Sequence, residues 1–142
     1  MVKQISIFVE NKTGRLAEVT KVLGDNDIDI SALSIADTTD FGILRLIVNK
    51  PEEAERILNE NGFTVSSTDV IAIAIPDTPG SLSKALKALD NSAIGIEYMY
   101  AFVGKLPDEA LVILRTENPE KATELLDATF IRVLTEDEVY SL

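Results

Sequence analysis

Apolar and polar residues alternate along the first segment of the chain and then adopt a helical spacing. From Lys3 to Glu10 nearly every second residue is apolar, which is typical of a β-strand with one face against a core. After a polar turn, apolar residues recur at intervals of three and four up to Leu23, which predicts an amphipathic helix ending near residues 24–27. Strand character returns from Ile28 to Ile35.

The following residues complete a unit of six elements. The polar turn Asp37–Asp40 precedes the apolar run Phe41–Val48, which predicts a β-hairpin. Pro51 suits the first turn of a second helix and Gly62 suits its end. Phe63–Ser67 is then a fourth strand. The predicted order is β-α-β-β-α-β, which indicates an α+β, ferredoxin-like fold with a four-stranded antiparallel sheet and two helices on one face.

The second half of the chain repeats the first. A shift of 66 positions, from Ile5 to Ile71, places residues 5–34 on residues 71–100 without a gap. After two extra residues in the second hairpin turn, Pro51 matches Pro119. The repeat predicts two domains, residues 1–68 and 69–142, with no flexible linker between them.

The second copy has its own element predictions. Asp69–Ile75 is expected to be its first strand, separate from Phe63–Ser67, and Thr135–Leu142 a frayed terminal helical turn. Simple alternation places Ile96 on the same side of a strand as Tyr98 and Tyr100. Because both sides of that strand then have apolar bulk, we expect the sheet or its edge to pair with another unit, giving a homo-oligomer, most simply a dimer.

Composition excludes several classes of function. The net charge of -11 argues against nucleic-acid partners, whose binding rests on Lys and Arg. The chain has no Cys and no His, which removes thiolate and imidazole chemistry. The acidic run Asp25–Asp29 lacks the spacing of a calcium loop, so neither a metal nor a cofactor is expected. No apolar run approaches the roughly 20 residues that cross a membrane, and a cytoplasmic location is predicted.

The glycine turns before the first helix of each copy are the strongest candidate site. A helix start presents unpaired N–H groups, and a glycine lets a small anion approach the main chain. The alternative is a structural turn in which Pro79 is the first helical residue, Asp77 or Thr78 caps the helix, and Lys12 and Arg15 are surface charges. A ligand would also need a partner for an ammonium group, such as Asn11 or Asp77.

A strand, an Asn/Asp-x-Pro/Thr-Gly-x-Leu turn, an amphipathic helix and a second strand, all within a β-α-β-β-α-β unit, resemble the ACT domain. This resemblance covers nearly the whole chain as two copies, and the segment DTPGSLSKALKAL is the closer match. It implies a non-catalytic regulatory module that binds an amino acid between the turn of one unit and the second strand of its neighbour.

The resemblance also implies roles for single residues. The turn role falls on Asn11, Thr13, Gly14, Arg15 and Leu16, and on Asp77, Pro79, Gly80, Ser81 and Leu82. The facing-strand role falls on Asp29 and Ile30, and on Gly95, Ile96 and Glu97. Thr13 replaces the proline usual in the family, and Gly95 lacks the carboxylate that Asp29 offers. The two sites are therefore expected to differ in affinity.

Three classes of function follow. The leading one is an amino-acid sensor that regulates a partner, such as a biosynthetic enzyme, in trans. A second is a ligand-free oligomerisation module. A third is an acylphosphatase-like enzyme, for which Arg15 and Asn11 lie near one turn but the glycine-rich phosphate cradle is absent.

Overall fold

The computed structural model describes residues 1–37, 40–104 and 106–142. The chain divides into two compact units. The first unit consists of residues Lys3–Thr68 with Tyr140–Leu142, and the second consists of Met1–Val2 with Asp69–Val139. Part of the predicted turn Asp37–Asp40, residues 38 and 39, lies outside the described residues.

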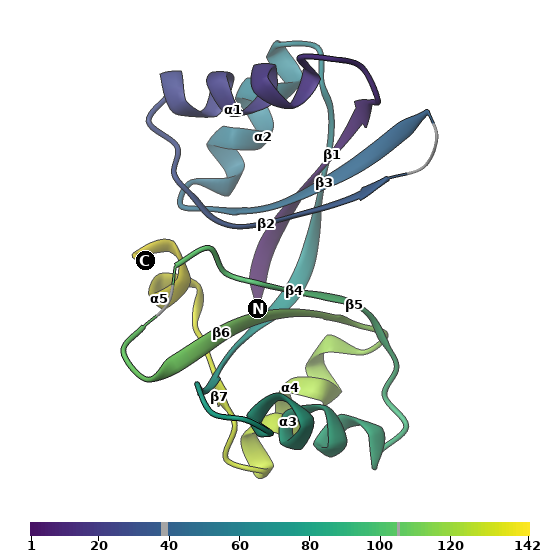
Figure 1. Cartoon of the computed structure of the whole chain (residues 1–142), viewed down its shortest axis with the longest axis vertical. Coiled ribbons are helices and arrows are strands. Elements are labelled where there is room, and N and C mark those ends of the chain that lie inside the picture. The colour runs from purple at the N-terminus through teal and green to yellow at the C-terminus, as the bar shows by residue number, and fades with distance from the viewer. Residues whose placement is uncertain (38–39, 105) are drawn as a thin grey trace. The chain divides into compact units, whose positions relative to one another are not determined.

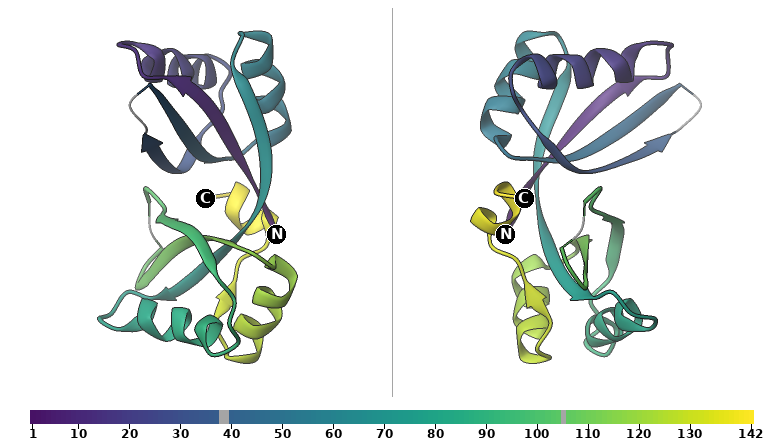
Figure 2. Two further views of the ribbon diagram at one scale, coloured as in Figure 1. Left: turned by 90° about the vertical axis from the view of Figure 1, so that its right-hand side faces the viewer. Right: turned by 60° about the vertical axis from the view of Figure 1, so that its left-hand side comes forward.

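The first unit has the predicted order of elements (Figure 1). They are β1 (Val2–Glu10), α1 (Arg15–Asp25), β2 (Ile30–Asp37), β3 (Phe41–Val48), α2 (Pro51–Glu60) and the beginning of β4 (Thr64–Pro76). The strand order is β2-β3-β1-β4, and β3 pairs antiparallel with both β1 and β2. The two helices lie on one face of the sheet, as the views in Figure 2 show. This unit is therefore a ferredoxin-like α+β unit.

The second unit repeats this arrangement from the remainder of β4. Its further elements are α3 (Ser81–Asp90), β5 (Ile96–Ala101), β6 (Glu109–Thr116), α4 (Pro119–Ala128), β7 (Arg132–Val133) and α5 (Glu136–Tyr140). The strand order is β5-β6-β4, with β7 paired to the other edge of β4, and all these pairs are antiparallel. The β-α-β-β-α-β prediction is thus confirmed in both halves.

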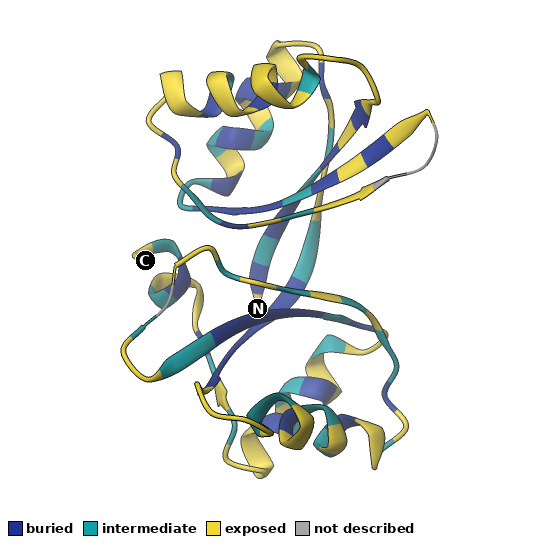
Figure 3. Ribbon diagram, in the orientation of Figure 1, coloured by how far each residue is buried: buried dark blue, intermediate teal, exposed yellow. Residues whose placement is uncertain are grey.

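Each unit has a core between its sheet and its helices. In the first unit the core includes Ile5, Ile7, Val9, Val19, Leu23, Leu44, Leu46, Ile57 and Leu58. In the second it includes Ile71, Ile73, Ile75, Ala85, Leu89, Val112, Leu114 and Leu126. Figure 3 shows the resulting alternation of buried and exposed positions, clearest along β3. Most of the apolar residues that predicted the strands and helices therefore pack together, whereas Leu16 of α1 and Phe41 and Ile43 of β3 are exposed.

Three local predictions were wrong. β4 is one continuous strand, because the polar residues 66–68 contain no glycine or proline to end it. The terminal turn is not frayed, since Val139 of α5 is buried and Thr135 and Glu138 exchange hydrogen bonds across its start, as in a capping box. The register of β5 shifts between Ile96 and Tyr98, which puts Ile96 against the helix-side core rather than beside Tyr98 and Tyr100.

Candidate functional site

The two glycine turns have the same backbone structure. Gly14 and Gly80 immediately precede α1 and α3 with φ values of 90° and 88°, in the left-handed region that favours glycine. The Asn11 N–H donates to the Asp40 carbonyl over 2.9 Å, and the Asp77 N–H donates to the Asp108 carbonyl over the same distance. Each turn is therefore tied to the hairpin of its own unit. The sequence repeat thus extends to individual hydrogen bonds.

The backbone amides at the start of both helices are only partly bonded. The N–H groups of Arg15 and Ser81, the first helical residues, donate over 3.3 Å to the carbonyls of Lys12 and Thr78. No side chain caps α1 or α3, and the first bonds within the two helices run from Glu18 to Gly14 and from Lys84 to Gly80. The structural alternative expected Pro79 to be the first helical residue. Pro79 instead lies before the capping glycine, and α3 begins at Ser81. Because no side chain caps these helices, the amides of the first turn beyond Arg15 and Ser81 can accept an anionic group.

The two basic side chains near the first turn differ in their surroundings, since Lys12 is exposed and Arg15 only partly so. The Arg15 guanidinium carbon lies 4.7 Å from the centre of the Phe63 ring, and its Nη1 lies 2.8 Å from the Glu18 carboxylate. Arg15 is thus a partly exposed charge that is held by contacts within its own unit. Lys12, which is well exposed, pairs with Glu10 at 2.7 Å, and this hydrogen bond lowers the pKa of Glu10. Arg15 is consequently engaged with its own unit rather than open to a phosphate.

The turn of the second unit is uncharged at the matching positions. Thr78 and Ser81 stand where the first unit has Lys12 and Arg15, and their hydroxyl oxygens are 2.8 Å apart. A cavity of about 700 Å³ lies beside this turn, between Asp77 and the hairpin residues Leu106–Asp108. This volume lies within the range of about 300–1,000 Å³ typical of small-molecule sites.

The facing-strand residues have different surroundings in the two units. Asp29 directly precedes β2, and its N–H donates to the Asn49 side chain over 2.9 Å. At the matching place in the second unit, the Glu117 carboxylate lies against Gly95, where a side chain would approach the carboxyl carbon to 2.9 Å. The absence of a side chain at Gly95 therefore makes room for Glu117.

A bulge marks the beginning of this strand in both units. The pairing register shifts between Ile30 and Ala32 in β2 and between Ile96 and Tyr98 in β5. Glu97, at the second shift, lies 3.4 Å from the Arg115 guanidinium. Bulges re-aim side chains and often occur beside functional sites.

The structure does not bring the turn and the facing strand together within one unit. The Asp77 turn is bonded to the hairpin end of the sheet, through Asp108, whereas Gly95 is bonded to Glu117 at the other end. The six-residue strand β5 separates the two ends by roughly 16–20 Å at about 3.3 Å per residue. An amino acid is too small to contact both sets of residues within one unit.

The sequence did not predict a cleft of about 640 Å³ in the second unit, here named the α3 cleft. It lies between α3, the end of β4 and the segment from α4 to β7, and its lining includes Thr78, Ser81, Lys84, Lys87, Ile131 and Arg132. One feature of the sequence could have indicated this cleft. Where the first copy has Arg15 and Glu18, the second has the smaller Ser81 and the oppositely charged Lys84.

Two negative findings hold for the described residues. No group of three Asp, Glu, Cys or His side chains is arranged to hold a metal ion there. None of the helices in that part of the chain has both the length and the apolar character needed to cross a membrane.

Comparison with curated proteins finds no match. Among solved structures, protein BT0572 from Bacteroides thetaiotaomicron is similar to the chain, with 45% identity and a TM-score of 0.94, and the match covers 99% of the chain and 96% of that protein. The regulatory subunit of aspartate kinase from Thermus thermophilus, ligand free, has 18% identity and a TM-score of 0.66, covering 90% and 91% of the two chains. The same subunit from Thermus flavus has 18% identity and a TM-score of 0.61, and the match covers 90% of this chain and 92% of that subunit.

The two aspartate kinase subunits, at this low identity, support the fold alone. The profile of a family described as an ACT domain pair covers the whole sequence, residues 1–142. The two ferredoxin-like units, each with a glycine turn before its first helix, agree with that description. The chain therefore belongs to the ACT domain pair family.

Proposed function

We propose that this protein is a non-catalytic regulator that binds a small amino acid at its glycine turns. The observation that supports this proposal is the pair of uncapped helix starts, each behind a left-handed glycine. Their amides suit an α-carboxylate, and Asn11 or Asp77 in the same turns suits an α-ammonium group. The residues proposed for the turn are those named from the sequence, with the second turn as the principal site because a cavity adjoins it.

A glycine turn by itself is too weak to be the whole site. A helix terminus contributes about 0.3–1 kcal/mol to anion binding, whereas micromolar affinity needs about 8 kcal/mol. The remainder must come from hydrogen bonds and burial that a second surface supplies. Because the facing strand of the same unit lies at the far end of its sheet, we propose that another copy of the chain supplies it. The functional form is then a homodimer or a larger homo-oligomer.

In this arrangement Asp29 and Ile30, and Gly95, Ile96 and Glu97, face the turn of a neighbouring unit. The ligand would couple its own binding to the pairing of the copies, since both sides of the site contact it. The change in pairing is the signal that a partner protein would recognise. We propose that this partner is an enzyme of amino-acid metabolism, regulated in trans in the cytoplasm.

A thermal-shift assay with each of the twenty amino acids tests the proposal. A ligand that binds only the folded state at about 100 times its Kd stabilises that state by about 2.7 kcal/mol. The Asp77→Ala variant, which removes the group proposed to receive the ammonium, should lose most of this shift, while Asp90→Ala, a matched change at the end of α3, should keep it. Absence of a shift with all twenty amino acids would contradict amino-acid binding.

The oligomeric state distinguishes the alternative of a ligand-free interaction module. Light scattering with and without the stabilising amino acid should show a change in the association constant if the ligand lies between copies. A constant association with no thermal shift would favour the interaction module. The acylphosphatase alternative has less support, because Arg15 already contacts Phe63 and Glu18.

A further inference from the structure

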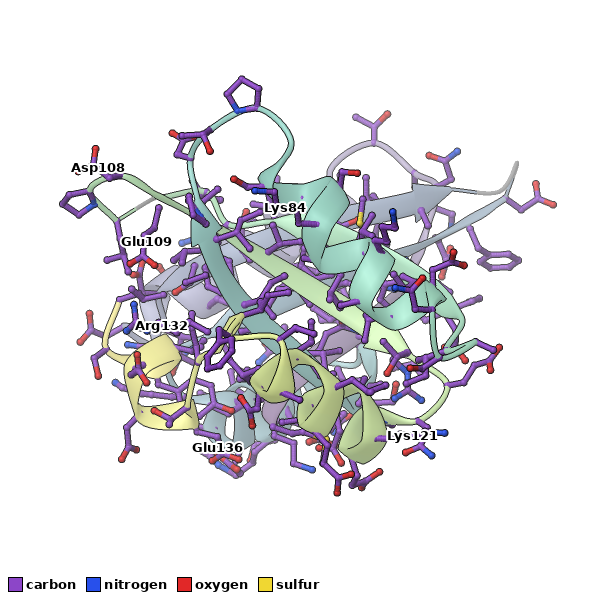
Figure 4. The ribbon with its side chains drawn as sticks, turned by 90° about the horizontal axis from the view of Figure 1, so that it is seen from below. Lys84, Asp108, Glu109, Lys121, Arg132 and Glu136 are labelled. Atoms are coloured by element: carbon purple, nitrogen blue, oxygen red, sulfur yellow. The ribbon has the colours of Figure 1, made fainter. Side chains whose placement is uncertain are left out.

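The α3 cleft gathers unpaired positive charge in a strongly acidic chain. Lys84 and Lys87 lie exposed on its α3 wall, and neither ammonium has an ion pair or a hydrogen bond among the described residues. Arg132, on the opposite wall, is already paired with Glu109 at 3.0 Å and with Glu138. Figure 4 shows Lys84 on α3 and the pair Glu109 and Arg132 on the same side of the unit. The uncompensated charge of the cleft therefore belongs to the two lysines.

The first unit fills the matching place with its own side chains. Arg15, Glu18 and Phe63 correspond in the repeat to Ser81, Lys84 and Ile131. In the first unit the guanidinium lies over the Phe63 ring and pairs with Glu18. In the second unit the small Ser81 hydroxyl replaces the guanidinium, and a lysine replaces the acid. The second unit thus lacks both the side chain that fills this space and the anion that neutralises it.

Phe130, on the lining of the cleft, gives a second and independent observation. Its φ is 63°, whereas the matching residue of the first unit is Gly62 with a φ of 84°. A bulky residue in the left-handed region is strained, and the ring is 97% exposed, so packing does not compensate for the strain. The helices α1, α2 and α3 also end on a residue with positive φ, at Asp27, Gly62 and Ala93, as helix ends commonly do. What marks Phe130 is that a large, exposed ring occupies this position on the lining of the cleft.

We propose that the α3 cleft, which shares Ser81 with the glycine turn of its unit, binds a small dianion, a molecule with two carboxylates or a phosphate, that differs in chemistry from the amino acid at the glycine turns. Lys84 and Lys87 would neutralise its two charges, and Phe130 would cover its apolar body. The lysines act as point charges, so carboxylate and phosphate oxygens satisfy them equally. The volume of about 640 Å³ accommodates a metabolite-sized molecule.

NMR of the full-length ¹⁵N-labelled protein tests this proposal with succinate, citrate and inorganic phosphate as probes. At millimolar probe, amide shifts should centre on Lys84–Ala88 and Thr129–Arg132, and added NaCl should weaken them because the attraction is electrostatic. A response to the two carboxylates alone identifies a carboxylate site, and a response to phosphate alone identifies a phosphate site. The absence of shifts at these residues with all three probes would overturn the proposal.

Two charge-matched variants control for a non-specific effect of net charge. Lys84→Glu installs the residue type that the first unit has at this place and should weaken binding by at least about tenfold. Lys121→Glu makes the same change of charge on α4, well away from Lys84 in Figure 4, and should alter the affinity less than about twofold. An equal loss in both variants would refute a specific site. The probes lack an ammonium group, so failure of this test and failure of amino-acid binding are separate results.

Discussion

Replacement of Phe130 by glycine is expected to stabilise the protein. The two residues Phe130 and Gly62 follow the second helix of their units, and each donates its N–H over 3.1 Å to a carbonyl three residues earlier. Both have positive φ values, 63° and 84°. Because an L side chain in this region crowds the following carbonyl, Phe130 adopts this conformation at a cost that Gly62 avoids. Phe130→Gly would give the second unit the residue that the first already has.

The size of the effect follows from three contributions. Relief of the left-handed strain raises the free energy of unfolding by about 1–2 kcal/mol. The greater freedom of glycine in the unfolded chain lowers the free energy of unfolding by about 0.5–1 kcal/mol. The ring is 97% exposed, so its loss forfeits almost no apolar burial. The net gain is about 0.5–1 kcal/mol, which corresponds to a rise in Tm of about 1–4 °C for a chain of this size.

Thermal unfolding of the wild type, Phe130→Gly and Phe130→Ala measures this effect. Phe130→Ala removes the ring but keeps the β-carbon, so it should retain most of the strain and melt close to the wild type. If Phe130→Gly melts no higher than Phe130→Ala, the left-handed conformation has no measurable cost and the reasoning is wrong. In the NMR assay with the dianions, Phe130→Gly should bind more weakly even though it is more stable, as expected for a strained residue that serves binding.

Two further predictions concern glycines and a carboxylate. Gly80→Ala should lower stability by about 0.5–1 kcal/mol, because Gly80 has a φ of 88° and the strain of about 1–2 kcal/mol in alanine is offset by about 0.5–1 kcal/mol from the smaller freedom of the unfolded chain. Gly24→Ala, within α1 and in open space, should instead raise stability by about 0.5–1 kcal/mol. Thermal melts of the two variants measure this, and a shift of Tm in the same direction for both would contradict the prediction. The Thr135 N–H, followed by Arg132, lowers the pKa of Glu138 from its ordinary 4.5. Its stabilisation is therefore present above pH 4.5 and disappears as the pH falls through the lowered pKa. Glu138→Gln should lower Tm at neutral pH and match the wild type in strong acid; a difference that does not depend on pH would show that charge is not the cause.

The sequence by itself determined the fold, because each signal was local or periodic. The change from alternating to helical spacing at Gly14 located β1 and α1, and Pro51 and Gly62 bounded α2. The repeat then transferred these assignments to the second half, where the φ of Gly80 is within a few degrees of that of Gly14. These features depend on neighbours in the sequence, which is why they could be predicted.

Only the tertiary structure decided which side chains meet. A one-residue register shift in β5 moved Ile96 to the helix-side core, and simple alternation cannot reveal such a shift. The stacking of Arg15 on Phe63 and the open α3 cleft depend on residues about 50 positions apart in the sequence. The sequence therefore specified two equal frameworks, whereas long-range packing decided that one unit fills this space with its own guanidinium and the other leaves it open.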